Sequence, residues 1–194
     1  MSENGPKPIL WLARHGETEW SKTLRHTGRT DIPLTETGRE EARAIREPLA
    51  AVEFDRVLCS PLSRARETCE LAGLGDRAEL RDELLEWDYG DYEGITSVEI
   101  RERNPDWVLW RDGCPGGESP GQVGARVDAL IASVLDETGN LALFAHGHVL
   151  RVLAARWVGL GPDGGKLLKL GTATLSRLGW EHENRVVDRW NSPA

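Results

Sequence analysis

The sequence has few cysteines and no long apolar run. Its cysteines, Cys59, Cys69 and Cys114, are odd in number and form no C-x-x-C pair, which argues against a disulfide framework and against a zinc knuckle. We expect all of them to be small buried side chains. No apolar run approaches the roughly 18 residues that a membrane-spanning helix needs, so we expect no membrane partner.

Positive charge is also in deficit. Lysine and arginine number 24 and aspartate and glutamate 32, which gives a formal net charge of -8. Binding to nucleic acid or to an anionic membrane requires clustered lysine and arginine, so this balance argues against both partners. An anionic ligand would have to be held by a local cluster of cations.

The length and the ends of the sequence set further expectations. The first residues, MSENGPKPIL, lack the basic region and the long apolar segment of a signal peptide, so we expect a cytoplasmic protein. The 194 residues are within the size range of one domain, and a chain of this size buries roughly 70% of its unfolded surface. Because we find no repeat, low-complexity tract or linker, we expect a single domain over residues 1–194.

Hydrophobic patterning predicts the fold class. Short apolar runs at residues 9–13, 57–59 and 141–145 do not alternate with polar residues, as expected of strands covered on both faces. Weaker strand patterns occupy residues 172–178 and 185–190. Helical spacing connects apolar residues between these runs: Ala42, Ile45, Leu49 and Val52 in one segment, and Val123, Val127, Leu130, Ile131 and Val134 in another. Strands that alternate with helices predict an α/β fold, a three-layer sandwich whose mostly parallel central sheet is flanked by helices.

Local signals mark where helices start and break. The dipeptide Ser60-Pro61 predicts an N-cap with proline at the first helical position. The segment Ser119-Pro120-Gly121-Gln122 predicts the same and adds a capping-box glutamine. Pro48 falls inside the first helical pattern and must kink or shorten that helix.

Charged residues follow three of the predicted strands. LWLARHGET (10–18) and LALFAHGH (141–148) are apolar runs that end in His-Gly, and CSPLSRARET (59–68) places Arg64 in the first turn of a helix. Ligands of open α/β sheets bind beyond the carboxyl ends of the strands, and a helix start favours an anion. Taken singly, such an arginine is more often part of a surface salt bridge, and such a histidine is more often structural. Their coincidence on one side of one sheet predicts an anion site with histidines, in which Arg14 and Arg64 grip one phosphate.

Four motifs carry a family resemblance: RHGET at 14–18, SPLSRARET at 60–68, EWDYGDYEG at 86–94 and AHGH at 145–148. In this order and spacing they resemble the histidine phosphatase superfamily, which includes cofactor-dependent phosphoglycerate mutases and many phosphatases. The segments TEWSK, WRDGCPGGES and AHGHVLR are similar in particular to its acid phosphatases and sedoheptulose bisphosphatases. The resemblance implies a phosphoglycerate mutase-like sandwich.

The resemblance implies roles for five residues. His15 would be the nucleophile that becomes a phosphohistidine, and Glu86 would be the proton donor. The phosphoryl oxygens would be cradled by Arg14, Arg64 and His146. Phosphoryl transfer needs an in-line nucleophile, positive charge around the equatorial oxygens and an acid for the departing alkoxide, so the residue types fit. Nearby guanidinium groups should also keep His15 neutral and able to attack.

Substrate contacts are implied at five further positions. Thr27 and the backbone of Gly28 would lie near the phosphate, and Ser21, Gly147 and His148 would contact the substrate. Ser21 and His148 each stand where mutases carry an asparagine, and a hydroxyl can still donate one hydrogen bond. For His148, a position facing the substrate and a purely structural place at a helix start are both open.

Other residues near the motifs are assigned less chemistry. Asp88, Asp91 and Glu93 are rival proton donors, but we expect an exposed acidic loop there. We expect His26 at the mouth of the site and His182 on the surface. For Trp107 and Trp110, core packing is favoured over stacking on a sugar, although Trp110 could line the entrance.

Together these features predict a metal-independent phosphatase that needs no cofactor and hydrolyses small phosphomonoesters, sugar phosphates or general acid phosphatase substrates. The alternative is a cofactor-dependent phosphoglycerate mutase. Mutases carry a long basic insertion after the proton-donor segment, and here only Arg101, Arg103 and Arg111 could replace it. The partner would be a small phosphorylated substrate, and tryptophan-rich surface elements suggest a homodimer.

Two other classes are disfavoured. A metal-dependent hydrolase conflicts with the arginines of the cluster, which would repel a divalent cation, so we expect no metal ligands. A catalytically inactive phosphate-binding module conflicts with the presence of all five core residues.

Overall fold

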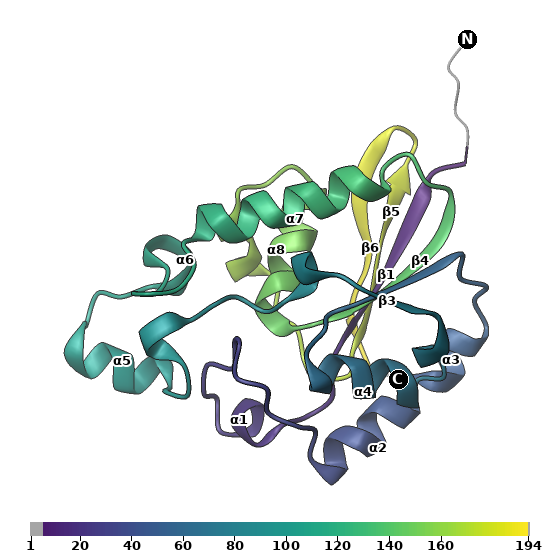
Figure 1. The fold of residues 1–194 in the computed structure, drawn as a ribbon. Coiled ribbons are helices and arrows are strands. Elements are labelled where there is room, and N and C mark those ends of the chain that lie inside the picture. Colours follow the sequence, from purple (N-terminus) through teal and green to yellow (C-terminus); the bar gives the residue numbers. More distant parts are fainter. Residues whose placement is uncertain (1–5, 194) are drawn as a thin grey trace.

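The structure, a computed structural model, describes residues 6–193 (Figure 1). The expectation about a signal peptide rests partly on residues 1–5, which lie outside the described residues. Within residues 6–193, no helix is both long and apolar enough to span a membrane.

A six-stranded sheet forms the centre of the fold, in the order β3-β2-β4-β1-β5-β6. The strands are β1 (Pro8–Arg14), β2 (Arg56–Cys59), β3 (Ala78–Leu80), β4 (Gly139–Ala145), β5 (Leu175–Glu181) and β6 (Asn184–Ser192). The first four strands in the sheet order are parallel, whereas β5 pairs antiparallel with β1, and β6 antiparallel with β5. The mostly parallel sheet is therefore confirmed. The sequence patterns missed β3 because this edge strand has only three residues and no fully buried one.

Helices cover both faces of this sheet, as predicted (Figure 1). The α-helices are α1 (Glu19–Lys22), α2 (Glu36–Ala44), α3 (Arg46–Ala50), α4 (Ser63–Leu71), α5 (Ser97–Arg103), α6 (Leu109–Asp112), α7 (Pro120–Val134) and α8 (Gly147–Trp157). The 3-10 helices are η1 (Gly75–Arg77), η2 (Asp82–Leu84), η3 (Gly90–Tyr92) and η4 (Pro162–Leu167). One core cluster contains the buried faces of α7 and α8, and the other contains residues of α3 and α4.

The central strands β1 and β4 contribute to both cores. Leu10 and Leu12 of β1 are buried in the core with α7 and α8, whereas Ala13 is buried in the other core. In β4, Leu143 and Phe144 divide between the two cores in the same way. Because both faces are covered, these strands can be apolar throughout, which explains the non-alternating runs in the sequence.

The helix-start and helix-break predictions have different outcomes. Ser119 caps α7 through the expected capping box with Gln122, and Pro120 is its first residue. The chain breaks between α2 and α3 ahead of Pro48, whose ring would clash with the carbonyl of Ala44 in a continuous helix.

The N-cap prediction for Ser60 is wrong. The helix α4 begins at Ser63, so Arg64 lies in its first turn, but Ser60 precedes the helix by three residues. The Ser60 hydroxyl is instead 2.7 Å from Nε2 of His146. At the start of α4 the side-chain acceptor is Asp31, whose Oδ1 accepts a hydrogen bond from the Ser63 N–H at 2.9 Å.

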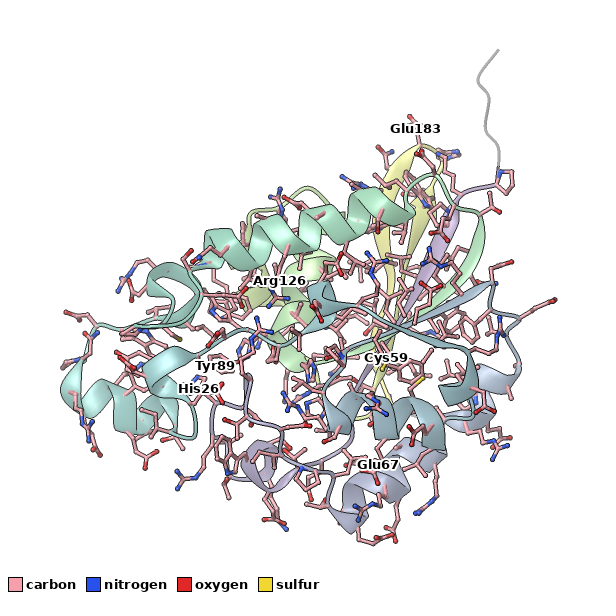
Figure 2. All side chains as sticks on the ribbon, viewed as in Figure 1. His26, Cys59, Glu67, Tyr89, Arg126 and Glu183 are labelled. Atoms are coloured by element: carbon pink, nitrogen blue, oxygen red, sulfur yellow. The ribbon has the colours of Figure 1, made fainter. Side chains whose placement is uncertain are left out.

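The cysteines are free and buried, as expected. Cys59 lies in the interior at the end of β2 (Figure 2).

The capping box of α7 provides a test of the local structure. Ser119→Ala removes the hydroxyl that accepts the Gln122 N–H, and loss of such a cap lowers the free energy of unfolding by about 1 kcal/mol. Urea denaturation of wild type and variant measures this difference. Ser119→Asn is the matched control, because asparagine is also a good N-cap, and it should restore most of the loss. Equal stabilities of wild type and Ser119→Ala would contradict the assignment.

Candidate active site

The sheet topology places the two His-Gly segments side by side. In the parallel pairing of β1 with β4, Arg14 stands opposite Ala145. The next residues, His15 and His146, therefore leave the sheet together, and the His15 N–H donates to the Ala145 carbonyl at 3.0 Å. The two imidazole rings lie with their centroids 5.2 Å apart.

His15 is held as a neutral imidazole with one free nitrogen. Its Nδ1 is 2.7 Å from the Gly16 carbonyl oxygen. Because a carbonyl can only accept, Nδ1 carries the proton and Nε2 carries the lone pair. Burial, followed by the charges of Arg64 and Arg14, lowers the pKa of His15 well below its ordinary value. The Nε2 atom is therefore unprotonated and available as a nucleophile at neutral pH.

Arg14 presents an unpaired donor beside this nucleophile. Its Nη1 donates to the Leu170 carbonyl at 2.6 Å. Its Nε is the one buried side-chain nitrogen or oxygen of residues 6–193 that has no hydrogen-bond partner. Gly147 faces the same group, since a Cβ there would lie 3.3 Å from the Arg14 Nε. A buried charged N–H group without an acceptor is costly, so this point favours an anionic ligand.

Arg64 and His146, whose ring lies beside that of His15, are hydrogen-bonded to each other. The Arg64 Nε donates to Nδ1 of His146 at 3.1 Å. Since a guanidinium can only donate, His146 carries its proton on Nε2, which donates to the Ser60 Oγ. Burial and the Arg64 charge lower the pKa of His146 well below its ordinary value.

The remaining N–H groups of Arg64 hold a neighbouring loop. Nη2 donates to the carbonyls of Thr27 and Gly28 at 3.1 and 2.8 Å, and Nη1 donates to the Thr30 carbonyl at 3.0 Å. The pocket is therefore lined by Arg14 and His15 but by neither Arg64 nor His146. Arg64 therefore contributes its charge and its support of the loop rather than a free donor.

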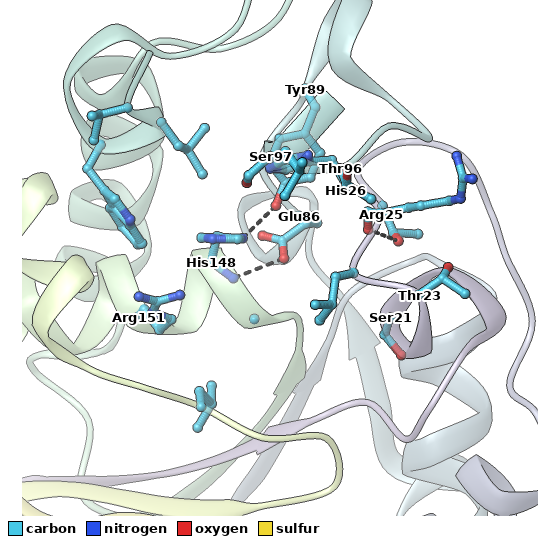
Figure 3. Close-up of a pocket in the computed structure, with 18 of the residues that line it drawn as sticks. Ser21, Thr23, Arg25, His26, Glu86, Tyr89, Thr96, Ser97, His148 and Arg151 are labelled. Carbon is cyan, nitrogen blue, oxygen red and sulfur yellow. Dashed lines mark hydrogen bonds between the residues drawn. The ribbon is translucent and has the colours of Figure 1, made fainter. Parts of the chain in front are cut away.

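Glu86 lies at the start of α8. Its Oε1 accepts from the backbone N–H groups of Trp87 and Val149 at 2.8 and 2.9 Å, and its Oε2 accepts from the N–H of His148 at 2.9 Å. The free N–H groups of a helix start and the helix dipole favour a negative group in this place. Figure 3 shows the carboxyl group beside His148 on the pocket wall.

His148 lies in the first turn of α8, where its backbone N–H donates to Glu86, and its side chain lines the pocket. Its Nδ1 lies 2.6 Å from the Tyr89 hydroxyl, and its ring packs on Trp110 with centroids 5.2 Å apart. Burial and the charge of Arg151 lower the pKa of His148 well below its ordinary value, whereas burial raises the pKa of Tyr89. Both groups are neutral.

The other expected contacts differ in how far they reach the pocket. Ser21 lines it, but its hydroxyl donates to the Thr18 carbonyl at 3.0 Å in the capping box of α1. Thr27 lines it as well, and its hydroxyl donates to the Arg25 carbonyl. Gly28 is buried against Glu93, where a Cβ would be 2.1 Å from the Glu93 Oε1.

The rival carboxylates stabilise loops instead of lining the pocket. Glu93 accepts from the backbone N–H groups of Arg29 and Thr30, and Asp88 accepts from the Gly90 N–H. Within residues 6–193, no three His, Cys, Asp or Glu side chains are grouped so as to hold a metal ion.

Tyr89 and Arg151 are pocket residues that the sequence motifs did not indicate. Both line a cavity of about 500 Å³, which His26 also lines, packed against the Tyr89 ring (Figure 2). The Arg151 guanidinium covers the Trp110 ring at 4.6 Å. The available signal for Arg151 was its place three residues after His148, on the same face of a helix. Trp110 is half-buried, and Trp107 is buried with its indole N–H donating to the Gly113 carbonyl at 2.8 Å, as core packing predicts.

Fold and site together define an α/β protein in which a neutral histidine at a sheet end lines a pocket together with Arg14. The family model of the histidine phosphatase superfamily (branch 1) matches residues 10–193, and the chain belongs to that superfamily. The predicted family and its α/β sandwich are confirmed.

Individual relatives match 79–95% of the chain. An acid phosphatase of Mycobacterium tuberculosis is 44% identical over 182 residues, 92% of this chain and 89% of that protein. A sedoheptulose 1,7-bisphosphatase of Saccharomyces cerevisiae is 38% identical over 186 residues, 79% of this chain and 69% of that protein. The solved structure of an open reading frame product from Mycobacterium tuberculosis has a TM-score of 0.91 at 41% identity, covering 95% of this chain and 97% of that one.

The neutral histidines predict how stability depends on pH. His15, His146 and His148 have lowered pKa values in the folded protein, whereas in the unfolded chain they bind protons near pH 6.5. Below that pH the unfolded state binds more protons, so stability falls as pH falls. Between pH 6.5 and 5.5 each histidine lowers the free energy of unfolding by about 1 kcal/mol, and the three together by up to about 3 kcal/mol.

Urea denaturation across this range measures the slope. His148→Gln should reduce it by about one proton equivalent. A free energy of unfolding that is constant from pH 7 to 5.5 would contradict the assignment of neutral buried histidines.

Proposed function

We propose that the protein is a phosphatase that hydrolyses small phosphomonoesters through a phosphohistidine formed at Nε2 of His15. The observation that carries the proposal is the free Nε2 of a neutral His15 beside Arg14, whose guanidinium has an unpaired buried Nε; both residues line one pocket. A nucleophile and a guanidinium that line the same cavity fit a phosphoryl group.

In the first step, the lone pair of His15 Nε2 attacks phosphorus and the bond from phosphorus to the ester oxygen breaks. Glu86 in its acid form gives its proton to the departing oxygen. The Nδ1–H bond to the Gly16 carbonyl stabilises the positive charge that the imidazole gains. Arg14 neutralises the phosphoryl oxygens, with the charge of Arg64 behind it.

In the second step, water attacks the phosphohistidine. Glu86, now a carboxylate held by three backbone N–H groups, accepts the proton of the water. The bond between phosphorus and Nε2 breaks, its electrons return to the imidazole, and inorganic phosphate leaves. Both steps use only residues of the described site.

Hydrolysis is better supported than mutase activity. The two curated relatives described above are both named as phosphatases. Of the three arginines that could replace the basic mutase insertion, only Arg101 lines the pocket. Sugar phosphates are the substrates that the name of the yeast relative favours. The homodimer and the absence of a nucleic-acid partner stay predictions from the sequence.

The role of Glu86 is tested by the dependence on the leaving group. Glu86→Gln removes the acid, so hydrolysis of an alkyl or sugar phosphate should lose about 10²–10⁴-fold in kcat/KM. The p-nitrophenolate of a p-nitrophenyl ester leaves without needing a proton, so kcat/KM for this ester should fall less than about tenfold. An equal loss on both esters would indicate a structural defect and contradict the acid role.

An assay of the wild-type protein with phosphoglycerate distinguishes phosphatase from mutase activity. The phosphatase proposal expects release of inorganic phosphate to exceed isomerisation of phosphoglycerate. Isomerisation faster than release would contradict it and favour the mutase.

A further inference from the structure

Exposed apolar side chains gather in the lining of the pocket, beside the exposed polar residues Thr23, Arg25 and Arg101. Leu24, Val98 and Val108 are 79%, 70% and 37% exposed, and all three line the pocket. In residues 6–193 the other exposed large apolar side chains, Leu80, Leu160 and Leu167, lie outside it. Single exposed apolar residues need no explanation, but a group around a cavity marks a contact surface for a ligand. We call Leu24, Val98 and Val108 the apolar rim.

Leu24 occupies a backbone position that suits glycine. The short helix α1 ends at Thr23 with two bonds of a Schellman turn, from the Leu24 N–H to the Ser21 carbonyl and from the Arg25 N–H to the Trp20 carbonyl. Leu24 is the left-handed residue of this turn, with φ +60°. Glycine is usual there because any Cβ is strained. The chain thus carries a strained leucine whose side chain gains no burial of its own, which indicates a use at the pocket mouth.

The rim segments are connected to one another. Arg25, next to Leu24, forms a β-bridge with Thr96, the N-cap of the helix that carries Val98. The Arg25 guanidinium also donates to the Gly94 carbonyl. Figure 3 shows Arg25, Thr96 and Ser97 on the same pocket wall. These contacts hold two rim residues at fixed places relative to each other, as a binding surface requires.

The lining of the pocket runs from buried residues to the exposed rim. A cavity of about 500 Å³ is of the size that holds a whole small-molecule ligand. His15 and Glu86, each 4% exposed, line it together with the rim residues, and Arg14, His148 and Arg151 line it as well. A leaving group whose phosphate lies at His15 therefore has the apolar rim within the same cavity.

We propose that the preferred substrate has a leaving group whose far end is apolar and is bound by the rim of Leu24, Val98 and Val108. This inference rests on the proposed phosphatase function and adds a substrate class to it. The substrate is a phosphomonoester of an amphiphilic alcohol, with its polar part near the phosphate and its apolar part at the mouth.

Primary n-alkyl phosphates from ethyl to octyl test the proposal. Their alcohols depart with nearly the same chemistry, so chain length changes only the apolar contact. Burial of a methylene is worth about 0.8 kcal/mol, and partial burial less, so kcat/KM should rise about two- to fourfold per methylene until the chain passes the mouth. We expect the ratio of kcat/KM for hexyl over ethyl phosphate to be at least about tenfold.

Rim variants assign the effect to these residues. The triple variant Leu24→Ser, Val98→Ser, Val108→Ser should lower the hexyl-to-ethyl ratio at least about fivefold. Leu24→Gly should lower the same ratio while the melting temperature stays equal or rises, because glycine relieves the left-handed strain. Leu80→Ser is the matched control, since Leu80 is 53% exposed but lies on β3, away from this pocket. It should leave the ratio unchanged.

The outcomes separate this inference from the function. A flat dependence on chain length, or a ratio that the rim variants do not change, overturns the apolar subsite and leaves the phosphatase intact. Absence of turnover with every ester overturns the proposed function and this inference together.

Discussion

The site depends on the hydrogen bonds that the buried guanidinium of Arg64 donates. The side chain is completely buried, and Asp31, the carboxylate with which it forms an ion pair, lies at 3.9 Å. Its charge is therefore satisfied by acceptors without full charge, which are the carbonyls of the 27–30 loop and Nδ1 of His146. A buried cation that lost these acceptors would be strongly destabilised. The loop must consequently stay packed on α4, and His146 must stay neutral so that it can accept.

The same charge serves the chemistry of His15 and costs the protein stability in acid. Burial, followed by the charges of Arg64 and Arg14, disfavours a proton on His15, and the strand pairing of β1 with β4 fixes its ring beside His146. A neutral histidine can attack phosphorus. In acid, however, each such histidine binds a proton in the unfolded state but not in the folded state, which lowers the stability of the fold. The site therefore combines readiness for an anion with a stability that depends on pH. In a chain of net charge -8, this local positive potential is what allows a phosphorylated ligand to enter.

The sequence predicted the parts of the site that follow from strand ends. The apolar runs before Arg14 and His146 indicated adjacent buried strands, and the structure places them in register. The N-cap prediction for Ser60 was wrong, because the Ser60 hydroxyl accepts a hydrogen bond from His146 instead. The two residues are 86 positions apart, so local sequence preferences do not reveal this contact. Likewise the pattern could not show that Arg64 would be occupied by loop carbonyls, or that Tyr89 would meet His148 across 59 positions. The sequence predicts which elements form, whereas the partners of buried polar groups depend on how those elements pack.

The central claim is that Nε2 of His15 forms a bond to phosphorus. Rapid quench of the enzyme with a phosphomonoester, followed by proteolysis and ³¹P NMR of the labelled peptide in base, locates the phosphoryl group. We expect an acid-labile, base-stable phosphohistidine on His15 at Nε2, and no label in His15→Ala. A phosphoryl group at Nδ1 or on another residue, or full turnover by His15→Ala, would contradict it.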